Sequence, residues 1–369
     1  MSIEALAEIS RYYGSNPDYV IAGGGNTSFK DRETLYIKGS GTALADAVPE
    51  AFVRMDRKAL AQIWNKTYPA ESAAREKAVL ADLMAAKKPG EEQKRPSVET
   101  MLHDLLPFEY VVHLHPAMVN GMTCSRQGEA AMKEIFPEAI WIPSTNPGYI
   151  LSLKVKKALD DYKVKNSRDA SIIFLQNHGV FVGADSVENI KDIYRDIMGG
   201  FEKKIQRKPD FSGENRAAPY GYIQIVEIIS GGKAAFLCNS EIAKVIKDRP
   251  SFYPVSSAFT PDHIVYAGSD PFFTDAQSEY EGEKAFKEHI EKTGRPPKIA
   301  ALRGLGIFGL GPTEKAANLA VELFKDSVKV AVYSESFGGP LFMEQDKIDF
   351  INNWEVEAFR TQVAVKQGE

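Results

Sequence analysis

The sequence contains only two cysteines, Cys124 and Cys238, among 369 residues. Two thiols cannot build a disulfide framework or a cysteine-based zinc knuckle. No run of about 18 apolar residues occurs, so we expect no membrane-spanning helix. The first residues also lack a basic stretch followed by an apolar one, the pattern of a secretory signal peptide. These absences predict a soluble, cytoplasmic protein that does not associate with membranes.

An excess of basic residues is missing as well. Lys and Arg total 45 and Asp and Glu total 50, which gives a formal net charge of −5. The chain therefore lacks the basic footprint of a nucleic-acid-binding protein. Hydrophobic residues make up 44% and charged residues 26%, an ordinary globular composition. The length fits two domains or one large domain.

A polar stretch rich in Gly and Pro, residues 206–221, has no periodicity and is the best linker candidate. We therefore expect two domains, residues 1–212 and 220–369. Strand-like and helix-like patterns alternate in both, which predicts α/β folds. In the second domain we expect strands at AAFLC, HIVYAG, KIAALRGLGIFGLG and KVAVYSE, and helices at about 240–247, 277–292, 312–325 and 345–363.

The six histidines can be inspected one by one. His113 and His115 are two residues apart in a β-type run, so their side chains point to one face of the strand. His178 lies in an Asn-His-Gly turn after another apolar run. Three imidazoles from adjacent strands can hold a zinc ion and leave a fourth position open. A structural role for each histidine is the competing interpretation, and spacing alone does not decide between them. His263 could help to line the active cleft, but a structural role is the simpler expectation for it, and His289 is expected to be solvated.

Glu99 and His103 are four residues apart on one face of an expected helix. Ser97 can cap this helix, which would then begin at Val98. A carboxylate near zinc could be a ligand or a general base. From the pattern alone, a first-turn glutamate favoured by the helix dipole is the simpler explanation.

Glycine-rich loops occur at three places. Residues 23–28 and 39–42 combine glycines with small hydroxyl residues and could cradle a phosphate, although ordinary hairpin turns are the alternative. Neither loop matches a nucleotide P-loop. The segment from Gly304 to Gly309 matches the G-x-G-x-x-G pattern of a dinucleotide-binding fingerprint. Too little chain follows for a Rossmann unit, so we expect a tight strand-to-helix turn and no nicotinamide cofactor.

Five short motifs occur together in one order along the first domain. They are Gly25-Asn26-Thr27-Ser28, Ile37-Lys38-Gly39-Ser40-Gly41-Thr42, Ser97-Val98-Glu99, His113-Leu114-His115-Pro116 and Asn177-His178-Gly179. In combination they resemble the motifs of the class II aldolase/adducin family. The resemblance implies a three-layer α/β/α domain with a central, largely antiparallel sheet, followed here by a smaller C-terminal α/β domain.

The resemblance also implies roles for individual residues. His113, His115 and His178 would bind Zn²⁺ or another divalent metal, and Glu99 would be the catalytic acid/base. The substrate phosphate would be bound by a set of polar residues, namely Asn26, Thr27, Ser40, Gly41 and Ser97. Val98 departs from the fuculose-type pattern, which has a second serine at this position, and this weakens the phosphate assignment there.

The similarity extends to the aldolase portion of long bifunctional rhamnulose-1-phosphate aldolase/short-chain dehydrogenase proteins. It is carried by PSVETMLHDLLPFEYVVHLHP, by TPDHIVYAG at 260–268, by RGLGIFGLG at 303–311 and by FINNWEVEAFR at 350–360. Since the sequence stops at Glu369, we expect the appended dehydrogenase domain to be missing.

The resemblance therefore implies an enzyme of carbohydrate metabolism, a metal-dependent aldolase. It would cleave a sugar or ketose phosphate, rhamnulose-1-phosphate-like, through an enediolate whose charge the metal stabilises. Epimerase, decarboxylase or dehydratase chemistry on the same metal site is the nearest alternative, and a non-catalytic, adducin-like binding protein is another. The resemblance further implies a homo-oligomer, possibly a tetramer. The sequence does not indicate which sugar is used.

Overall fold

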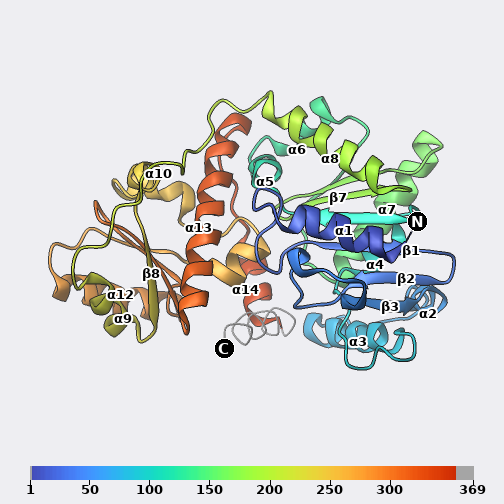
Figure 1. The fold of residues 1–369 in the computed structure, drawn as a ribbon, viewed down its shortest axis with the longest axis horizontal. Helices are drawn as coiled ribbons and strands as arrows, with labels where there is room; N and C mark the ends of the chain where they lie inside the picture. Colours follow the sequence, from blue (N-terminus) through green and yellow to red (C-terminus); the bar gives the residue numbers. More distant parts are fainter. Residues whose placement is uncertain (1, 355–369) are drawn as a thin grey trace. The chain divides into compact units, whose positions relative to one another are not determined.

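The computed structural model describes residues 2–354, which form two compact units (Figure 1). The first unit comprises the residues up to Thr123 together with Gly128–Lys204, and the second comprises Cys124–Gln127 and the residues from Ile205 onward. The expected domain limits, 1–212 and 220–369, stay a prediction. Within the described residues, no helix has the length and apolar character needed to cross a bilayer.

The first unit is built on a seven-stranded sheet with the order β3-β2-β1-β4-β7-β6-β5. All neighbouring strands are antiparallel except β5 and β6, which are parallel. The expectation of a largely antiparallel sheet is therefore confirmed. The strands are β1 (Asn26–Lys30), β2 (Thr34–Lys38), β3 (Phe52–Asp56), β4 (Tyr110–Leu114), β5 (Ile140–Ile142), β6 (Ile172–Leu175) and β7 (Gly179–Ala184).

Helices cover both faces of this sheet and complete the expected three layers. One face packs against α1 (Ile3–Gly14), α5 (Ala117–Thr123) and α8 (Val187–Glu202), with α6 (Gly128–Ile135) beside α5. The other packs against α2 (Arg57–Ile63), α3 (Ser72–Ala85), α4 (Thr100–Leu105) and α7 (Tyr149–Asn166). Alternate strand residues enter each face. Val111 and Phe181, for example, join the core under α4 and α7.

The second unit is a smaller α/β structure around a four-stranded sheet with the order β8-β11-β10-β9. The strands β9 and β10 are parallel, and the other neighbours are antiparallel. The strands are β8 (Lys233–Leu237), β9 (Phe272–Thr274), β10 (Ile299–Leu302) and β11 (Gly306–Gly311). The helices are α9 (Tyr222–Ser230), α10 (Ser240–Val245), α11 (Arg249–Phe252), α12 (Glu279–Thr293), α13 (Glu314–Ser334) and α14 (Gln345–Asn353).

Two expected strands of the second unit are wrong. HIVYAG forms a π-helical turn at His263–Ala267, and KVAVYSE lies mostly in the last part of α13. All five residues of the π-turn are buried, and so are most residues in the last part of α13. A short, uninterrupted apolar run has no helical or strand periodicity to reveal its conformation, because every side of it is covered.

Other element limits differ by smaller amounts. The helix expected to begin at Val98 begins at Thr100, with Glu99 at its N-cap position. The helix expected at 345–363 ends at Asn353, and the remainder of that expectation lies outside the described residues. Two helices were not predicted from the sequence. They are α5, which follows His115-Pro116, and α9, which follows the polar stretch 206–221.

The glycine motif at 304–309 is not a strand-to-helix turn, so that expectation is wrong. It forms the turn of the β10–β11 hairpin and the first residues of β11. Gly304 lies in the turn with φ +72°. A Cβ at Gly309 would lie 2.2 Å from the Ala317 carbonyl oxygen, so glycine here lets α13 approach β11 closely. The spacing reflects packing in a hairpin.

We expect Gly309→Ala to lower the free energy of unfolding by roughly 1–3 kcal/mol, because the added methyl group overpacks the α13–β11 contact. Urea unfolding of the full chain, followed by circular dichroism, would show this as a lower midpoint. Gly282→Ala in α12 is the matched control, since a Cβ there meets its nearest atom at 4.0 Å. It should be neutral or slightly stabilising. Equal midpoints for the two variants would contradict the packing explanation.

Candidate active site

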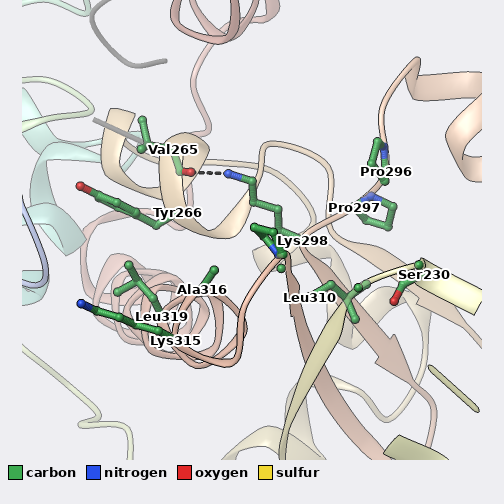
Figure 2. Close-up of a pocket in the computed structure, with 14 residues that line it drawn as sticks. Ser230, Val265, Tyr266, Pro296, Pro297, Lys298, Leu310, Lys315, Ala316 and Leu319 are labelled. Carbon is green, nitrogen blue, oxygen red and sulfur yellow. Dashed lines mark hydrogen bonds between the residues drawn. The ribbon is translucent and has the colours of Figure 1, made fainter. Parts of the chain in front are cut away.

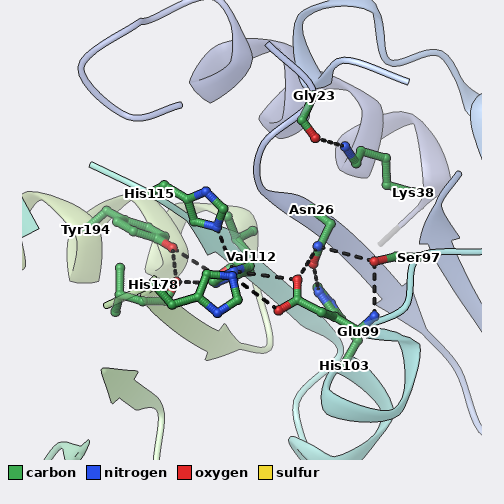
Figure 3. Close-up of polar contacts among 12 residues, drawn as sticks. Gly23, Asn26, Lys38, Ser97, Glu99, His103, Val112, His115, His178 and Tyr194 are labelled. Atoms are coloured by element: carbon green, nitrogen blue, oxygen red, sulfur yellow. Dashed lines mark hydrogen bonds and ion pairs between the residues drawn. The ribbon is translucent and has the colours of Figure 1, made fainter. Parts of the chain in front are cut away.

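The two central strands β1 and β4 bring the first site residues together. Asn26 begins β1 and is the direct antiparallel partner of His113 in β4. His115 follows the end of β4, and His178 lies in the turn between β6 and β7. Since β7 pairs with β4, this turn returns His178 to the end of the strand that carries His113 (Figure 3).

The three imidazoles face one another. One nitrogen from each of His113, His115 and His178 lies within 4.8 Å of the others. The Nε2 atoms of His113 and His115 are 2.9 Å apart. Within residues 2–354 this is the one group of three His, Cys, Asp or Glu side chains found with the spacing of a metal site. The cluster expected from the sequence is therefore present and can hold a metal ion.

Neighbouring groups fix the orientation of His113. Its ring is buried and stacks on Phe181, with ring centroids 3.9 Å apart. Its Nδ1 lies 3.1 Å from the Val180 carbonyl oxygen, which can only accept, so Nδ1 carries the proton. The Nε2 lone pair then points toward the other two rings, as in metal-binding histidines whose second nitrogen is hydrogen-bonded.

A buried tyrosine supports this arrangement. The Tyr194 hydroxyl donates to the carbonyl oxygens of Val112 and Val180, at 3.0 and 3.3 Å. These carbonyls belong to the paired strands β4 and β7. Burial raises the pKa of Tyr194 well above its ordinary value, so the phenol stays protonated as a donor.

The polar atoms around the three rings fit a divalent cation. The Glu99 carboxylate lies next to them, with Oε2 3.6 Å from His113 Nε2 and Oε1 3.7 Å from His178 Nε2. Glu99 Oε1 is buried and has no hydrogen-bond partner among the described residues. Two tetrahedral Zn–N bonds of about 2.0–2.1 Å place their nitrogens about 3.3 Å apart, close to the 2.9 Å seen between His113 and His115. A set of imidazoles with one carboxylate suits zinc and other transition metals.

Asn26 connects Glu99 to a second buried histidine. Its Nδ2 donates to Glu99 Oε2 at 2.6 Å, and its Oδ1 accepts from His103 Nε2. His103 Nδ1 then accepts from the Ser28 hydroxyl at 2.7 Å. Burial lowers the pKa of His103 well below its ordinary value, which keeps the ring neutral. The sequence reading placed Glu99 and His103 on one helical face but assigned His103 no part in the site.

A buried lysine anchors the start of this network. Lys30 Nζ donates to the His103 carbonyl oxygen at 2.6 Å. Burial lowers the pKa of Lys30 to about 7. The amine thus fixes the backbone of α4 against β1 and helps to place the His103 ring.

Ser97 and the second glycine loop lie beside the same carboxylate. Ser97 Oγ accepts from the Glu99 N–H at 3.2 Å and from Asn26 Nδ2 at 3.3 Å. Gly39 pairs with Pro96, and the Ser40 N–H donates to the Arg95 carbonyl at 2.8 Å, which places the loop next to Ser97.

Lys38 ties the two glycine loops together. Its Nζ donates to the carbonyl oxygens of Gly23 and Thr42, at 3.2 and 2.8 Å. Gly41 adopts φ +89°, a conformation that favours glycine. Both loops therefore belong to one connected structure around Asn26.

Thr27 lies apart from these groups. Its hydroxyl is hydrogen-bonded to the Ser10 hydroxyl at 2.7 Å, on the face of β1 that packs against α1. Successive strand residues point to opposite faces, so the neighbour of Asn26 turns away from the histidines.

The two histidines outside this unit take structural positions. His263 is buried, and its Nε2 lies 3.0 Å from Asp326 Oδ2, in keeping with the structural role expected for it. His289 is half-buried and its Nε2 donates to the Asp270 carbonyl at 3.1 Å, so the expectation of a solvated ring is wrong. An inward-facing position on the otherwise charged helix α12 accounts for the difference.

Comparison with known proteins gives one curated relative and several solved structures. The protein named "Uncharacterized oxidoreductase YuxG" from Bacillus subtilis (strain 168) is 20% identical over 424 residues, which cover 100% of this chain and 59% of the relative. The chain thus spans about 59% of the length of that relative.

Among solved structures, the N-terminal Class II Aldolase domain of a conserved protein from Thermoplasma acidophilum is 26% identical, with a TM-score of 0.47, over 56% of this chain and 94% of that chain. The L-fuculose-1-phosphate aldolase from Thermus thermophilus is 17% identical, with a TM-score of 0.35, over 54% of this chain and 90% of that one.

A family model gives the assignment. The model described as "Class II Aldolase and Adducin N-terminal domain" matches residues 4–195, just over half of the chain. The match includes the three histidines, Glu99 and Asn26. The chain therefore belongs to the class II aldolase/adducin family.

Proposed function

We propose that this protein is a zinc-dependent class II aldolase that performs retro-aldol cleavage of a sugar or ketose phosphate, rhamnulose-1-phosphate-like. The observation that carries the proposal is the convergence of three imidazoles with one buried carboxylate. Glu99 lies 3.6 and 3.7 Å from two of the rings and has one oxygen without a hydrogen-bond partner. A non-catalytic, adducin-like binding protein would not require three clustered imidazoles together with a buried carboxylate.

His113, His115 and His178 would hold the ion. When bound, a divalent metal supplies a positive charge that stabilises the negative charge released as the carbon–carbon bond breaks. Neutral imidazoles leave that charge undiminished. The Nδ1–H donated by His113 to Val180 and the stacking on Phe181 keep the ring in the orientation that metal binding needs.

Glu99 would move the proton at the reacting carbon. Asn26 holds Oε2 through a 2.6 Å hydrogen bond, while Oε1 has no such partner. A carboxylate with one oxygen fixed and the other available is suited to proton transfer, because its position is set without occupying the reacting atom. Ser97 adds to this placement by accepting the backbone N–H of Glu99.

We propose that the substrate's phosphate, or another anionic or hydroxylated end, lies against Asn26, Ser40, Gly41 and Ser97. Backbone N–H groups and small hydroxyls in tight loops are suited to anions. Thr27 is left out of this set because its hydroxyl is bonded to Ser10. Val98 stands where fuculose-type enzymes have a second serine, so this position offers no hydroxyl to a phosphate.

The curated relative is longer and bears the name of an oxidoreductase. This agrees with a fused aldolase and dehydrogenase, and we propose that the present chain corresponds to the aldolase portion. We further propose that the enzyme works as a homo-oligomer. Its oligomeric state and its expected cytoplasmic location stay predictions.

A retro-aldol screen tests the proposed function. Ketose 1-phosphates of differing stereochemistry would be incubated with the zinc-loaded protein, and dihydroxyacetone phosphate would be detected by a coupled enzyme. We expect release from at least one substrate and its loss when a chelator removes the metal. Metal-dependent inversion, decarboxylation or dehydration without cleavage would replace the aldolase proposal with one of those chemistries. No turnover by a fully metal-loaded protein across the screen would contradict an enzymatic role on these substrates.

A further inference from the structure

A cavity in the second unit lies outside the part of the chain that the family model matches. Its volume is about 340 Å³, within the range of small-molecule sites. It is enclosed by the turn between α9 and β8, the π-turn, the end of β11 and the first turns of α13 (Figure 2). Nothing in the proposed aldolase chemistry uses it.

Lys298 is a positively charged residue that lines this cavity. Its Nζ donates to the Val265 carbonyl oxygen in the π-turn. Its carbonyl oxygen accepts the Leu310 N–H at 2.8 Å, which fixes the backbone to β11. Gly268 ends the π-turn with φ +80° and lies next to the lysine stem. The side chain is held in one place before any ligand arrives.

The charge of the cavity has one sign. Lys298 and Lys315 both line it, and none of the described lining residues is acidic. The α13 N-terminus, which adds a partial positive charge, also borders it. Burial lowers the pKa of Lys298 to about 8, so an anion beside it would offset the cost of keeping it charged. A lysine has three N–H donors, and the bond to Val265 uses one.

Most of the rest of the wall is apolar, apart from Ser230 and Tyr266. Val265, Leu310, Leu319 and the two prolines Pro296 and Pro297 supply most of it. Such a surface favours binding of the hydrocarbon part of a ligand and offers few polar contacts to a fully hydrated ion. The ammonium group has two further N–H donors, which match the two oxygens of a carboxylate. A phosphate has more oxygens and more negative charge, so its binding needs more donors and more positive charge.

We propose that this cavity binds a small carboxylate with a short hydrocarbon body, its acid group on Lys298 and its body against the apolar wall. The site is separate from the histidine cluster and does not depend on the aldolase proposal. Hexanoate is a suitable probe, with 1-hexanol as its uncharged counterpart and acetate as the acid without the body.

Isothermal titration of hexanoate into the full chain tests the proposal. We expect one site per chain, with acetate and 1-hexanol each at least tenfold weaker. Lys298→Met keeps an unbranched side chain of nearly the same length and removes the charge, and it should weaken hexanoate binding at least tenfold. Lys287→Met is the matched control, because Lys287 is exposed on α12 and pairs with Glu283. It should bind as the parent protein does.

Leu319→Trp offers a second route, since it fills the cavity and keeps Lys298. It should also abolish hexanoate binding, even if Lys298→Met proves poorly folded. Acetate controls for carboxylate binding elsewhere, including at a bound metal. Unchanged hexanoate affinity in a folded Lys298→Met or Leu319→Trp protein would overturn the proposal. So would inorganic phosphate binding as tightly as hexanoate, or an absence of hexanoate binding to the parent chain.

Discussion

Glu99→Gln is expected to keep the metal and to lower kcat by roughly 10²–10⁴-fold, the usual contribution of a general acid/base. Glutamine has nearly the same shape, and its carbonyl oxygen can still accept the 2.6 Å hydrogen bond from Asn26 Nδ2. It cannot take up a proton at the other position. The loss should therefore fall on turnover and leave metal content unchanged, as measured by elemental analysis of the purified variant alongside retro-aldol kinetics.

Glu76→Gln is the matched control for that experiment. Glu76 is also a buried glutamate of the first unit, and it accepts a hydrogen bond from the Tyr149 N–H at 3.1 Å. Its neutralisation changes a buried carboxylate away from the histidines, so kcat should stay near the parent value. Full activity in Glu99→Gln would remove Glu99 from the reaction and leave the histidine cluster as the remaining part of the proposal.

His113→Ala is expected to reduce the zinc content from one ion per chain to a small fraction of that value. His113 is the most buried of the three proposed ligands, and the hydrogen bond to the Val180 carbonyl fixes the orientation of its ring. Its removal takes away one of three imidazoles and leaves a cavity beside Phe181. We expect the loss of activity to follow the loss of metal, and the stabilisation that zinc gives the parent protein to disappear. Elemental analysis and thermal unfolding with and without added zinc would measure both effects.

His103→Ala separates metal loss from simple damage to the core. His103 is equally buried but bonds to Asn26 and Ser28 rather than facing the other histidines. The variant should lose stability and keep its zinc. His115→Ala, at a half-buried position, gives a second test of metal loss should His113→Ala fold poorly. Zinc retained at full content in both ligand variants would refute the assigned ligand set.

Strand geometry explains how much of the site was predictable from the sequence. His113 and His115 share a face because their spacing is two, and a hairpin around Asn177-His178-Gly179 returns the third ring to the neighbouring strand. These are local rules that a sequence displays directly. The contact between Asn26 and Glu99 is different, because it depends on the register of β1 against β4 and on where α4 begins. No local pattern encodes that register, so the link to His103 was missed.

The second unit shows more clearly where prediction from local sequence patterns fails. In KVAVYSE the valines favour a strand by propensity, yet most of the segment completes α13, where burial on most sides outweighs that preference. Gly304, Gly306 and Gly309 are spaced like a cofactor motif, but one is in a turn and two relieve close contacts inside a strand. Composition and spacing identify such segments as buried or closely packed, and tertiary contacts decide their shape.

The antiparallel pairing of β4 with β7 also has a consequence for how the chain would acquire the proposed metal ion during synthesis. His178 leaves the ribosome well after His113 and His115, and it reaches them only when β7 closes against β4. A growing chain that has not yet paired these two strands would offer an ion only two of the three clustered imidazoles. If the three histidines bind the proposed ion, tight binding would require the middle of the sheet to assemble first, so a chain carrying the ion would be one whose first unit has already folded.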